Sequence, residues 1–378
     1  RIKLPEGSYT LRAEPLRPRK PRAPFNRIAF AAAHVVADSL SAADPSGPPV
    51  LDWERTLAYR RHLLDLGFGI AEAMDTSQRG MGLDWPRALE LITRSLDDAG
   101  PRAGRIFSGC GTDQLDPASA RSPDDVVKAY LEQLAAIQKR GGRIIMMASR
   151  ALVRVARSPD DYVKVYSRVL AEADHPVILH WLGDMFDPAL KGYWGSAAFA
   201  PAMEPCLSAI AANARKVDGI KISLLDDQKE IVMRRRLPRG VMMYTGDDFN
   251  YPALIAGDEK GHSHALLGIF DAIAPAASAA LSALAGGDMK KYDALLAPTV
   301  PLSRLIFRAP TQYYKTGIVF LAWLNGHQDH FVMVNGAQAM RPLPYFTEIF
   351  RLADQARLLS DPELAVKRMK QLLAVYGA

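Results

Sequence analysis

Short apolar runs alternate along this chain with longer segments of helical periodicity. Eight of the runs have the length and composition of buried strands: Arg27–Val36, Phe68–Met74, Arg105–Cys110, Arg143–Ala148, Val177–Leu182, Val217–Ser223, Val241–Thr245 and His262–Leu267. Each is followed by helical material, such as Trp53–Leu66 after the first run and Pro123–Arg140 after the third. Eight such units over about 250 residues predict an α/β fold, the (β/α)₈ TIM barrel. The competing doubly wound sheet would carry a glycine-rich turn after its first strand, and Ala33–Asp38 has none.

The barrel pattern covers residues 27–287 and is flanked by two segments of different character. Residues 1–26 are basic, contain five prolines and lack periodicity, which is typical of an extended arm on the body or on a partner subunit, or of a loosely ordered tail. Residues 288–378 show no further strands. They predict a helical C-terminal extension, with helices over Met289–Leu295, Ile306–Leu324, Tyr345–Leu359 and Pro362–Val375.

Composition and charge narrow the class of protein. The net charge of +6 arises from 47 basic and 41 acidic residues, and much of it lies in the arm and in Arg234–Arg236 at the end of a predicted helix. The basic residues are not interleaved with aromatic ones, so no nucleic-acid partner is expected. Two cysteines, Cys110 and Cys206, are too few for a disulfide framework or a structural zinc site. Without a secretory signal pattern or an apolar run of about 18 residues, we expect a cytoplasmic protein with no membrane partner.

Lys221 lies in the middle of the apolar strand Val217–Ser223. Burying an ammonium group costs several kcal/mol unless the group is paired or loses its proton. Desolvation by Ile220, Ile222 and the barrel wall would lower the pKa of the amine, and an unprotonated amine can attack a carbonyl to form an imine. Lys221 is therefore a candidate Schiff-base nucleophile. The alternative is a structural lysine that pairs with a barrel carboxylate such as Glu72.

Several short motifs between Asp218 and Leu305 are best compared with known families as one set. They are Gly219-Ile-Lys-Ile-Ser223, Tyr244-Thr-Gly-Asp-Asp248, the strand after Gly261, the alanine-rich helix, Gly287-Asp-Met-Lys290 and Leu302-Ser-Arg-Leu305. Together they resemble the dihydrodipicolinate synthase and N-acetylneuraminate lyase family. That family consists of class I aldolase barrels with a helical C-terminal extension, commonly tetrameric, in which the lysine of G-x-K-x-[S/T] forms an imine with a 2-keto acid. The resemblance implies this role for Lys221.

The resemblance continues upstream with differences. Thr76 and Ser77 match the hydroxyl pair of the family's G-T-T-G-E turn, which contacts the keto-acid carboxylate and relays protons. Asp75 replaces the first glycine of that turn, and Gln78-Arg79 replaces its Gly-Glu pair. On the fifth strand, His180 stands where the family has its proton-shuttling tyrosine, and the arginine of that motif is absent. These differences indicate a divergent branch of unknown function.

Other side chains are expected near the site. If Thr76 faces the barrel interior, strand alternation places Glu72 on the same face, either as a substrate-binding residue or in a structural ion pair. Ser223 shares a face with the strand lysine and could bind substrate. Asp247 follows the seventh strand and either shapes the site or caps a helix. Arg150, after the fourth strand, is a candidate carboxylate anchor or an exposed surface arginine.

These observations predict a Schiff-base-forming lyase, aldolase or dehydratase that acts on a 2-keto acid or keto-sugar acid. Lys221 would be the nucleophile, His180 the proton carrier because histidine titrates near pH 6.5, and Thr76 and Ser77 the carboxylate-binding pair. This chemistry requires no cofactor or metal. The helical extension and the arm indicate a homo-oligomer, a dimer or a tetramer.

Two other classes of function stay open at this stage. One is a hydrolase or isomerase dependent on a divalent metal, with histidine and carboxylate ligands near the predicted carboxyl ends of strands: His34, His180, His262, His264, Glu72, Asp75, and Asp184 or Asp187. The other is a non-catalytic barrel that binds a sugar acid.

Overall fold

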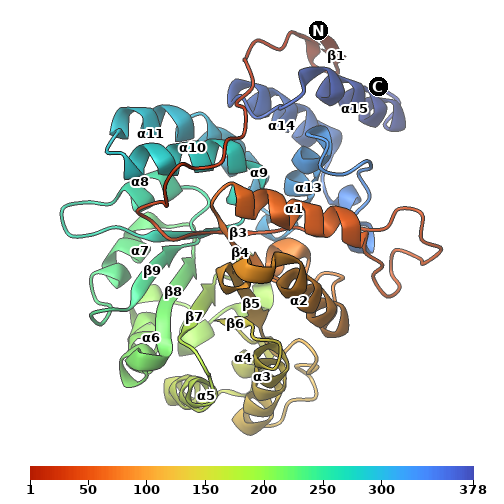
Figure 1. Cartoon of the computed structure of the whole chain (residues 1–378). Coiled ribbons are helices and arrows are strands. Elements are labelled where there is room, and N and C mark those ends of the chain that lie inside the picture. Colours follow the sequence, from red (N-terminus) through yellow and green to blue (C-terminus); the bar gives the residue numbers. More distant parts are fainter.

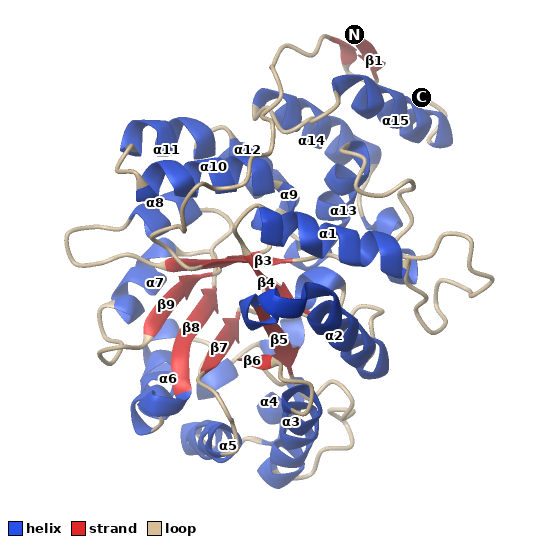
Figure 2. Cartoon of the chain, in the orientation of Figure 1, coloured by secondary structure: helices blue, strands red, loops and turns tan.

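The eight predicted strands form one closed barrel in the computed structural model, which describes residues 1–378 (Figures 1 and 2). All neighbouring strands are parallel, they follow the order of the chain, and the last pairs with the first. The strands are β3 (Ala29–Ala32), β4 (Gly69–Glu72), β5 (Ile106–Cys110), β6 (Arg143–Met146), β7 (Val177–Leu182), β8 (Val217–Ser223), β9 (Met242–Thr245) and β10 (His264–Leu267). The predicted (β/α)₈ barrel is confirmed.

Ten helices surround the strands, consistent with the predicted alternation. They are α1 (Trp53–Asp65), α2 (Trp85–Ala99), α3 (Pro123–Gln138), α4 (Arg150–Val155), α5 (Pro159–Ala171), α6 (Phe199–Ala212), α7 (Asp227–Arg234), α8 (Tyr251–Ala256), α9 (Ile269–Ala272) and α10 (Ala274–Ala285). Helices α3 and α5 both begin with a capping box, formed by Ser122 with Asp125 and by Ser158 with Asp161. None of the helices in the structure combines the length and the apolar character needed to cross a membrane.

Strand alternation divides the buried side chains into two cores. A small inner core fills the barrel and includes Phe30, Phe107, Ile178 and Tyr244. A large outer core lies between the strands and the surrounding helices. Because side chains of a strand alternate, this division decides which polar residues reach the barrel interior.

The C-terminal extension contains α11 (Met289–Leu296), α12 (Thr299–Ile306), α13 (Tyr314–Leu324), α14 (Leu343–Gln355) and α15 (Pro362–Val375). The predicted single helix Ile306–Leu324 is wrong, because α12 ends at Ile306 and α13 begins only at Tyr314. Pro310 lies in the gap, where it lacks an amide hydrogen and disfavours helical backbone in the preceding residue. This interruption directs the first turn of α13 toward the barrel.

The N-terminal arm lies along the body of its own chain. It starts with a small hairpin of β1 (Ile2–Leu4) and β2 (Gly7–Tyr9), which the sequence pattern did not indicate. The hydroxyl of Tyr9 donates to Asp354 on α14 over 2.7 Å, and the amide of Leu16 donates to the carbonyl of Arg357 over 2.8 Å. In Figure 1 the arm, drawn in red, then runs past α10 to the beginning of β3.

Candidate active site

Lys221 projects into the barrel from β8 and is only 4% exposed. The adjacent strand β9 ends next to Gly246, where a Cβ atom would lie 2.7 Å from Lys221 Cε. Glycine at this position therefore leaves the space that the Lys221 side chain occupies. Burial lowers the pKa of Lys221, while the charges of Asp75 and Asp248 oppose this shift without forming a hydrogen bond to the amine. The predicted desolvated amine is thus present, and it is not paired with Glu72.

The two carboxylates near Lys221 have pKa values shifted in opposite directions. Burial would raise the pKa of Asp75, but the charges of Lys221 and Lys315, the neighbouring His180 and a hydrogen bond from Tyr314 outweigh it, so the pKa is lowered. Burial raises the pKa of Asp248 to about 8. At neutral pH the site therefore holds one ionised and one largely protonated carboxyl group.

Tyr314 links the C-terminal extension to the turn after β4. Its hydroxyl donates to Asp75 Oδ2 over 2.6 Å and lies 2.6 Å from Thr76 Oγ1. Since the single hydroxyl hydrogen of Tyr314 points to the carboxylate, Thr76 is the donor in the second bond. The other oxygen of Asp75, Oδ1, is buried and has no hydrogen-bond partner. A chain of hydrogen bonds therefore runs from Thr76 through Tyr314 to Asp75, whose second carboxylate oxygen is free.

His180 lies on β7, and in the register between β7 and β8 it pairs with Lys221. Its Nε2 atom is 3.1 Å from Ser223 Oγ, so the predicted residues His180, Lys221 and Ser223 are brought together inside the barrel. Burial, followed by the charge of Lys221, lowers the pKa of His180 well below its usual value. The expectation that this histidine titrates near neutral pH is wrong, because the barrel interior keeps the ring neutral.

Lys315, next to Tyr314 on α13, is a second buried lysine that sequence reasoning missed. It is 5% exposed and its pKa is lowered to about 8 by burial, against the opposing charges of Asp75 and Asp187. Its Nζ lies 3.2 Å from Met81 Sδ. A signal was available, because Lys315 opens an apolar helical run in the same way that Lys221 interrupts an apolar strand.

A cavity of about 330 Å³ opens beside these residues at the carboxyl end of the strands. Asp75 and His180 line its inner part, and Arg150 and Asp187 line it together with residues of the loop after β5. Arg150 Nε donates to Asp187 over 2.6 Å, and the arginine side chain is 45% exposed. Lys221 is not part of the lining, whereas its neighbours Asp75 and His180 are. The size suits a small molecule.

Glu72 does not reach this cavity. It forms two 2.8 Å bonds to the guanidinium of Arg60 and a 2.6 Å bond from Ser95, in the layer between β4 and the helices. The placement of Glu72 by strand alternation is wrong, because β4 ends there and Ala73 adopts a left-handed conformation, with φ of 52°. That residue breaks the alternation on which the prediction depended. Glu72 forms the structural ion pair considered as its alternative role.

Two other predicted substrate-binding residues have their polar atoms engaged in local structure. Ser77 Oγ donates to the carbonyl of Met74 over 2.7 Å, within the turn that carries Thr76. Asp247 accepts bonds of 2.8 and 3.0 Å from the amides of Phe249 and Asn250, in the turn before α8. It does not have the helix-capping role considered from the sequence, because α8 begins at Tyr251 and no side chain caps it. The next residue, Asp248, is one of the two carboxylates whose charges act on Lys221.

The histidines considered as metal ligands are distributed over different parts of the barrel. His262 precedes β10 and His264 is its first residue, so neither lies near the carboxyl end of a strand, where they were considered as ligands. His34 is engaged with Asp271, whose Oδ2 is 2.8 Å from His34 Nδ1. The structure brings no group of three or more histidine, cysteine or acidic side chains into a metal-binding arrangement.

Comparisons with known proteins agree with this architecture. A family profile described as "Protein of unknown function (DUF993)" matches residues 3–378. A comparison with curated protein sequences finds no match.

Among solved structures, a prophage protein of the dihydrodipicolinic acid synthase family from Escherichia coli K12, determined with pyruvate, has a TM-score of 0.68 at 16% identity over 88% of this chain and 99% of its own. Dihydrodipicolinate synthase from Acinetobacter baumannii, also with pyruvate, has a TM-score of 0.63 at 14% identity over 88% and 99%. The synthase from Aquifex aeolicus has a TM-score of 0.59 at 13% identity over 93% and 98%. The chain therefore belongs to the DUF993 family and has the fold of the dihydrodipicolinate synthase structures.

Proposed function

We propose that this protein is an imine-forming lyase of the class I aldolase type, with Lys221 as the nucleophile and a 2-keto acid or keto-sugar acid as the substrate. The observation that carries the proposal is the buried, unpaired amine of Lys221, whose pKa is lowered by burial at the carboxyl end of a barrel strand. Catalytic groups of TIM-barrel enzymes lie at this end. An amine in such a place is available to attack a carbonyl.

The opposite pKa shifts of Asp75 and Asp248 support an acid and base pair around Lys221. Two carboxyl groups whose environments separate their pKa values can take the two roles at one pH. The ionised Asp75 accepts the proton that the amine loses as it attacks. Asp248, with its pKa of about 8, donates a proton to the carbonyl oxygen as the carbinolamine forms. Asp75 then passes its proton to the resulting hydroxyl, which leaves as water and gives the protonated imine.

The chain of Thr76, Tyr314 and Asp75 supports a second proton path. After imine formation, a lyase must move a proton to or from the substrate at the bond that breaks or forms. Thr76 and Tyr314 are joined over 2.6 Å, and the path leads to the unpartnered Asp75 Oδ1. We assign proton transfer to this hydrogen-bonded chain of side chains. The neutral His180 has a positioning role, because it holds the Ser223 hydroxyl.

The substrate class is inferred from the cavity and from the related structures. A volume of about 330 Å³ accommodates a short keto acid, and Arg150 at its wall offers a guanidinium for the carboxylate. Two of the structures with the same fold were determined with pyruvate, itself a 2-keto acid.

Trapping with borohydride tests the proposal directly. The protein is incubated with pyruvate and sodium borohydride, and the modified peptide is identified by mass spectrometry. We expect one reduced adduct on Lys221 in the wild type and none in Lys221→Arg. Lys315→Arg is the matched control, because it removes the other buried amine of lowered pKa and should leave the adduct on Lys221. An adduct on Lys315 alone, or none with a panel of 2-keto acids, contradicts the proposal.

Assembly and location remain predictions. We expect a homodimer or homotetramer in the cytoplasm, and light scattering during size-exclusion chromatography measures the assembly state.

A further inference from the structure

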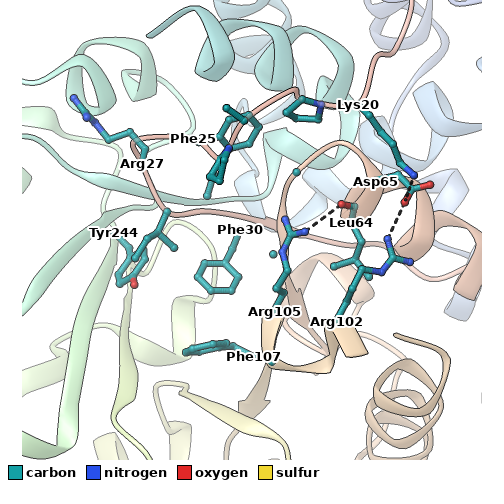
Figure 3. A pocket seen from close by; sticks show the side chains of 18 of the residues that line it. Lys20, Phe25, Arg27, Phe30, Leu64, Asp65, Arg102, Arg105, Phe107 and Tyr244 are labelled. Atoms are coloured by element: carbon teal, nitrogen blue, oxygen red, sulfur yellow. Dashed lines mark hydrogen bonds and ion pairs between the residues drawn. The ribbon is translucent and has the colours of Figure 1, made fainter. Parts of the chain in front are cut away.

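A second cavity, drawn in Figure 3, has a volume of about 810 Å³ and lies where the barrel strands begin, at the end opposite to the cavity lined by Asp75 and His180. Its floor is made by residues at the beginning of the strands, among them Phe30 on β3, Gly69 on β4 and Arg143 on β6. Residues 20–25 of the N-terminal arm provide one wall, and the cavity lies within the size range of small-molecule sites.

The arm is packed firmly at this cavity, so the wall is part of the fold. Gly67 has a φ of 96°, and a Cβ atom on it would lie 2.8 Å from the ring of Phe25 and 2.9 Å from Pro21 Cγ. The ring of Phe25 also packs against Phe68, with 5.9 Å between the ring centroids. Arg27 holds the end of the arm by donating to the carbonyl of Ile255 over 2.8 Å.

Positive charge exceeds negative charge around the cavity. Six basic side chains line it, against two carboxylates: Lys20, Arg22, Arg27, Arg102, Arg105 and Arg143 against Asp65 and Asp218. Figure 3 shows Asp65 between Lys20 and Arg102, to which it is paired over 3.4 and 2.8 Å. Arg105 donates to the backbone carbonyls of Leu64 and Phe68, which leave its charge uncompensated. A concave surface of this kind concentrates anions.

Arg143 lines this cavity, and its side chain forms no hydrogen bond or ion pair. Its guanidinium carbon lies 4.4 Å from the centroid of the Phe107 ring, and its Nε is buried without a hydrogen-bond partner. A buried donor without an acceptor is costly, and a carboxylate or phosphate is the acceptor that a guanidinium binds in a bidentate manner. The rings of Phe25, Phe30 and Phe107 lie around the same space, where a planar group could pack (Figure 3).

We propose that this cavity binds a small organic anion that combines a planar ring with a carboxylate or phosphate group. The ring would lie among the aromatic side chains, and the anionic group would bind Arg143, with Arg22 of the arm contributing charge. Such a ligand bridges the arm and the barrel. The site is independent of the reaction proposed for Lys221, since it lies at the other end of the barrel.

Isothermal titration calorimetry of the full chain with phenyl phosphate tests the proposal. We expect saturable binding at one site, and binding at least about tenfold weaker for inorganic phosphate, which lacks the ring, and for benzyl alcohol, which lacks the charge. Arg143→Gln should weaken the binding of phenyl phosphate by about tenfold or more, and Arg22→Gln should weaken it to a smaller extent. Arg154→Gln, which removes an exposed arginine on α4, and Lys221→Met should leave the affinity unchanged.

Three results would overturn the site. They are the absence of saturable binding to the folded wild type, equal affinities of the wild type and both cavity variants, and loss of binding in Lys221→Met. Arg22 lies on the exposed arm, so its replacement leaves the fold intact and the test holds even if Arg143→Gln is unstable.

Discussion

Tyr314 and Asp75 are 239 positions apart in the sequence, and a hydrogen bond of 2.6 Å joins them. It fastens the first turn of α13, in the C-terminal extension, to the turn after β4. The extension therefore contributes directly to the candidate active site.

Replacing Tyr314 by phenylalanine tests this contribution. Tyr314→Phe removes the donor to Asp75 and the acceptor of the Thr76 hydroxyl, so we expect turnover to fall by about a hundredfold, the effect of losing one proton-transfer group. The adduct with pyruvate should still form on Lys221. Pre-steady-state trapping and steady-state kinetics separate the two effects. Tyr313→Phe is the matched control, because Tyr313 forms no such bond. Equal activities of the two variants would exclude the proton path.

The unpaired amine of Lys221 should cost stability. Lys221→Met removes the desolvated amine and keeps an unbranched side chain of similar length, so we expect the free energy of unfolding to rise by about 1 kcal/mol while adduct formation is lost. Chemical denaturation measures the first effect and mass spectrometry the second. A loss of stability in this variant would indicate that the lysine has a structural role instead.

Gly246 is predicted to be essential for the position of Lys221. In Gly246→Ala the new methyl group would lie 2.6 Å from the carbonyl oxygen of Ile222, 2.7 Å from Lys221 Cε and against Ser223 Oγ. We expect a stability loss of about 1–3 kcal/mol, typical of overpacking, and adduct formation at least tenfold slower. Gly104→Ala is the control, since a Cβ atom there has no neighbour within 4 Å. Normal trapping by Gly246→Ala would show that the lysine has more room than this geometry allows.

Asp248 should give both stability and reaction a pH dependence. Its pKa is about 8 in the folded protein and near 3.9 in the unfolded chain, so only the folded state holds the proton between these values. Stability therefore falls as the pH rises through this window, and trapping should slow as the pH rises through about 8 because the proton donor is lost.

Asp248→Asn should reduce the pH dependence of stability and abolish the decline in trapping above pH 8. Burial also raises the pKa of Glu230 to about 8, so Glu230→Gln should change the stability profile in the same direction. Because Glu230 is bonded to Ser263 and its pKa is not influenced by the charge of Lys221, its replacement should leave the trapping profile unchanged. Identical trapping profiles for the wild type and Asp248→Asn would remove Asp248 from the mechanism.

Glu72 should affect stability and not the reaction. Glu72→Gln leaves the buried guanidinium of Arg60 without its carboxylate, and breaking such a pair costs about 3–5 kcal/mol. We expect that loss in denaturation experiments, with unchanged trapping by the fraction that remains folded. Glu54→Gln, on the exposed face of α1, is the control and should change stability by less than about 0.5 kcal/mol.

Sequence reasoning predicted the order of strands and helices, because buried strands and amphipathic helices are encoded by short-range patterns. The strands Val177–Leu182 and Val217–Ser223 have the predicted bounds, and Ser122 and Ser158 begin helices as expected. The buried lysine was also visible in the sequence, since lysine is rarely found in the middle of an apolar strand unless it is paired or functional.

Only the tertiary structure decided what surrounds that lysine. Tyr314 and Lys315 reach the site because Pro310 interrupts a predicted helix and the extension folds back over the barrel mouth. Glu72 leaves the site because one left-handed residue, Ala73, ends the alternation of its strand. Local sequence patterns determine the helices and strands. Contacts between distant parts of the chain determine where a side chain at the end of an element points. They also determine the protonation state that burial imposes on that side chain.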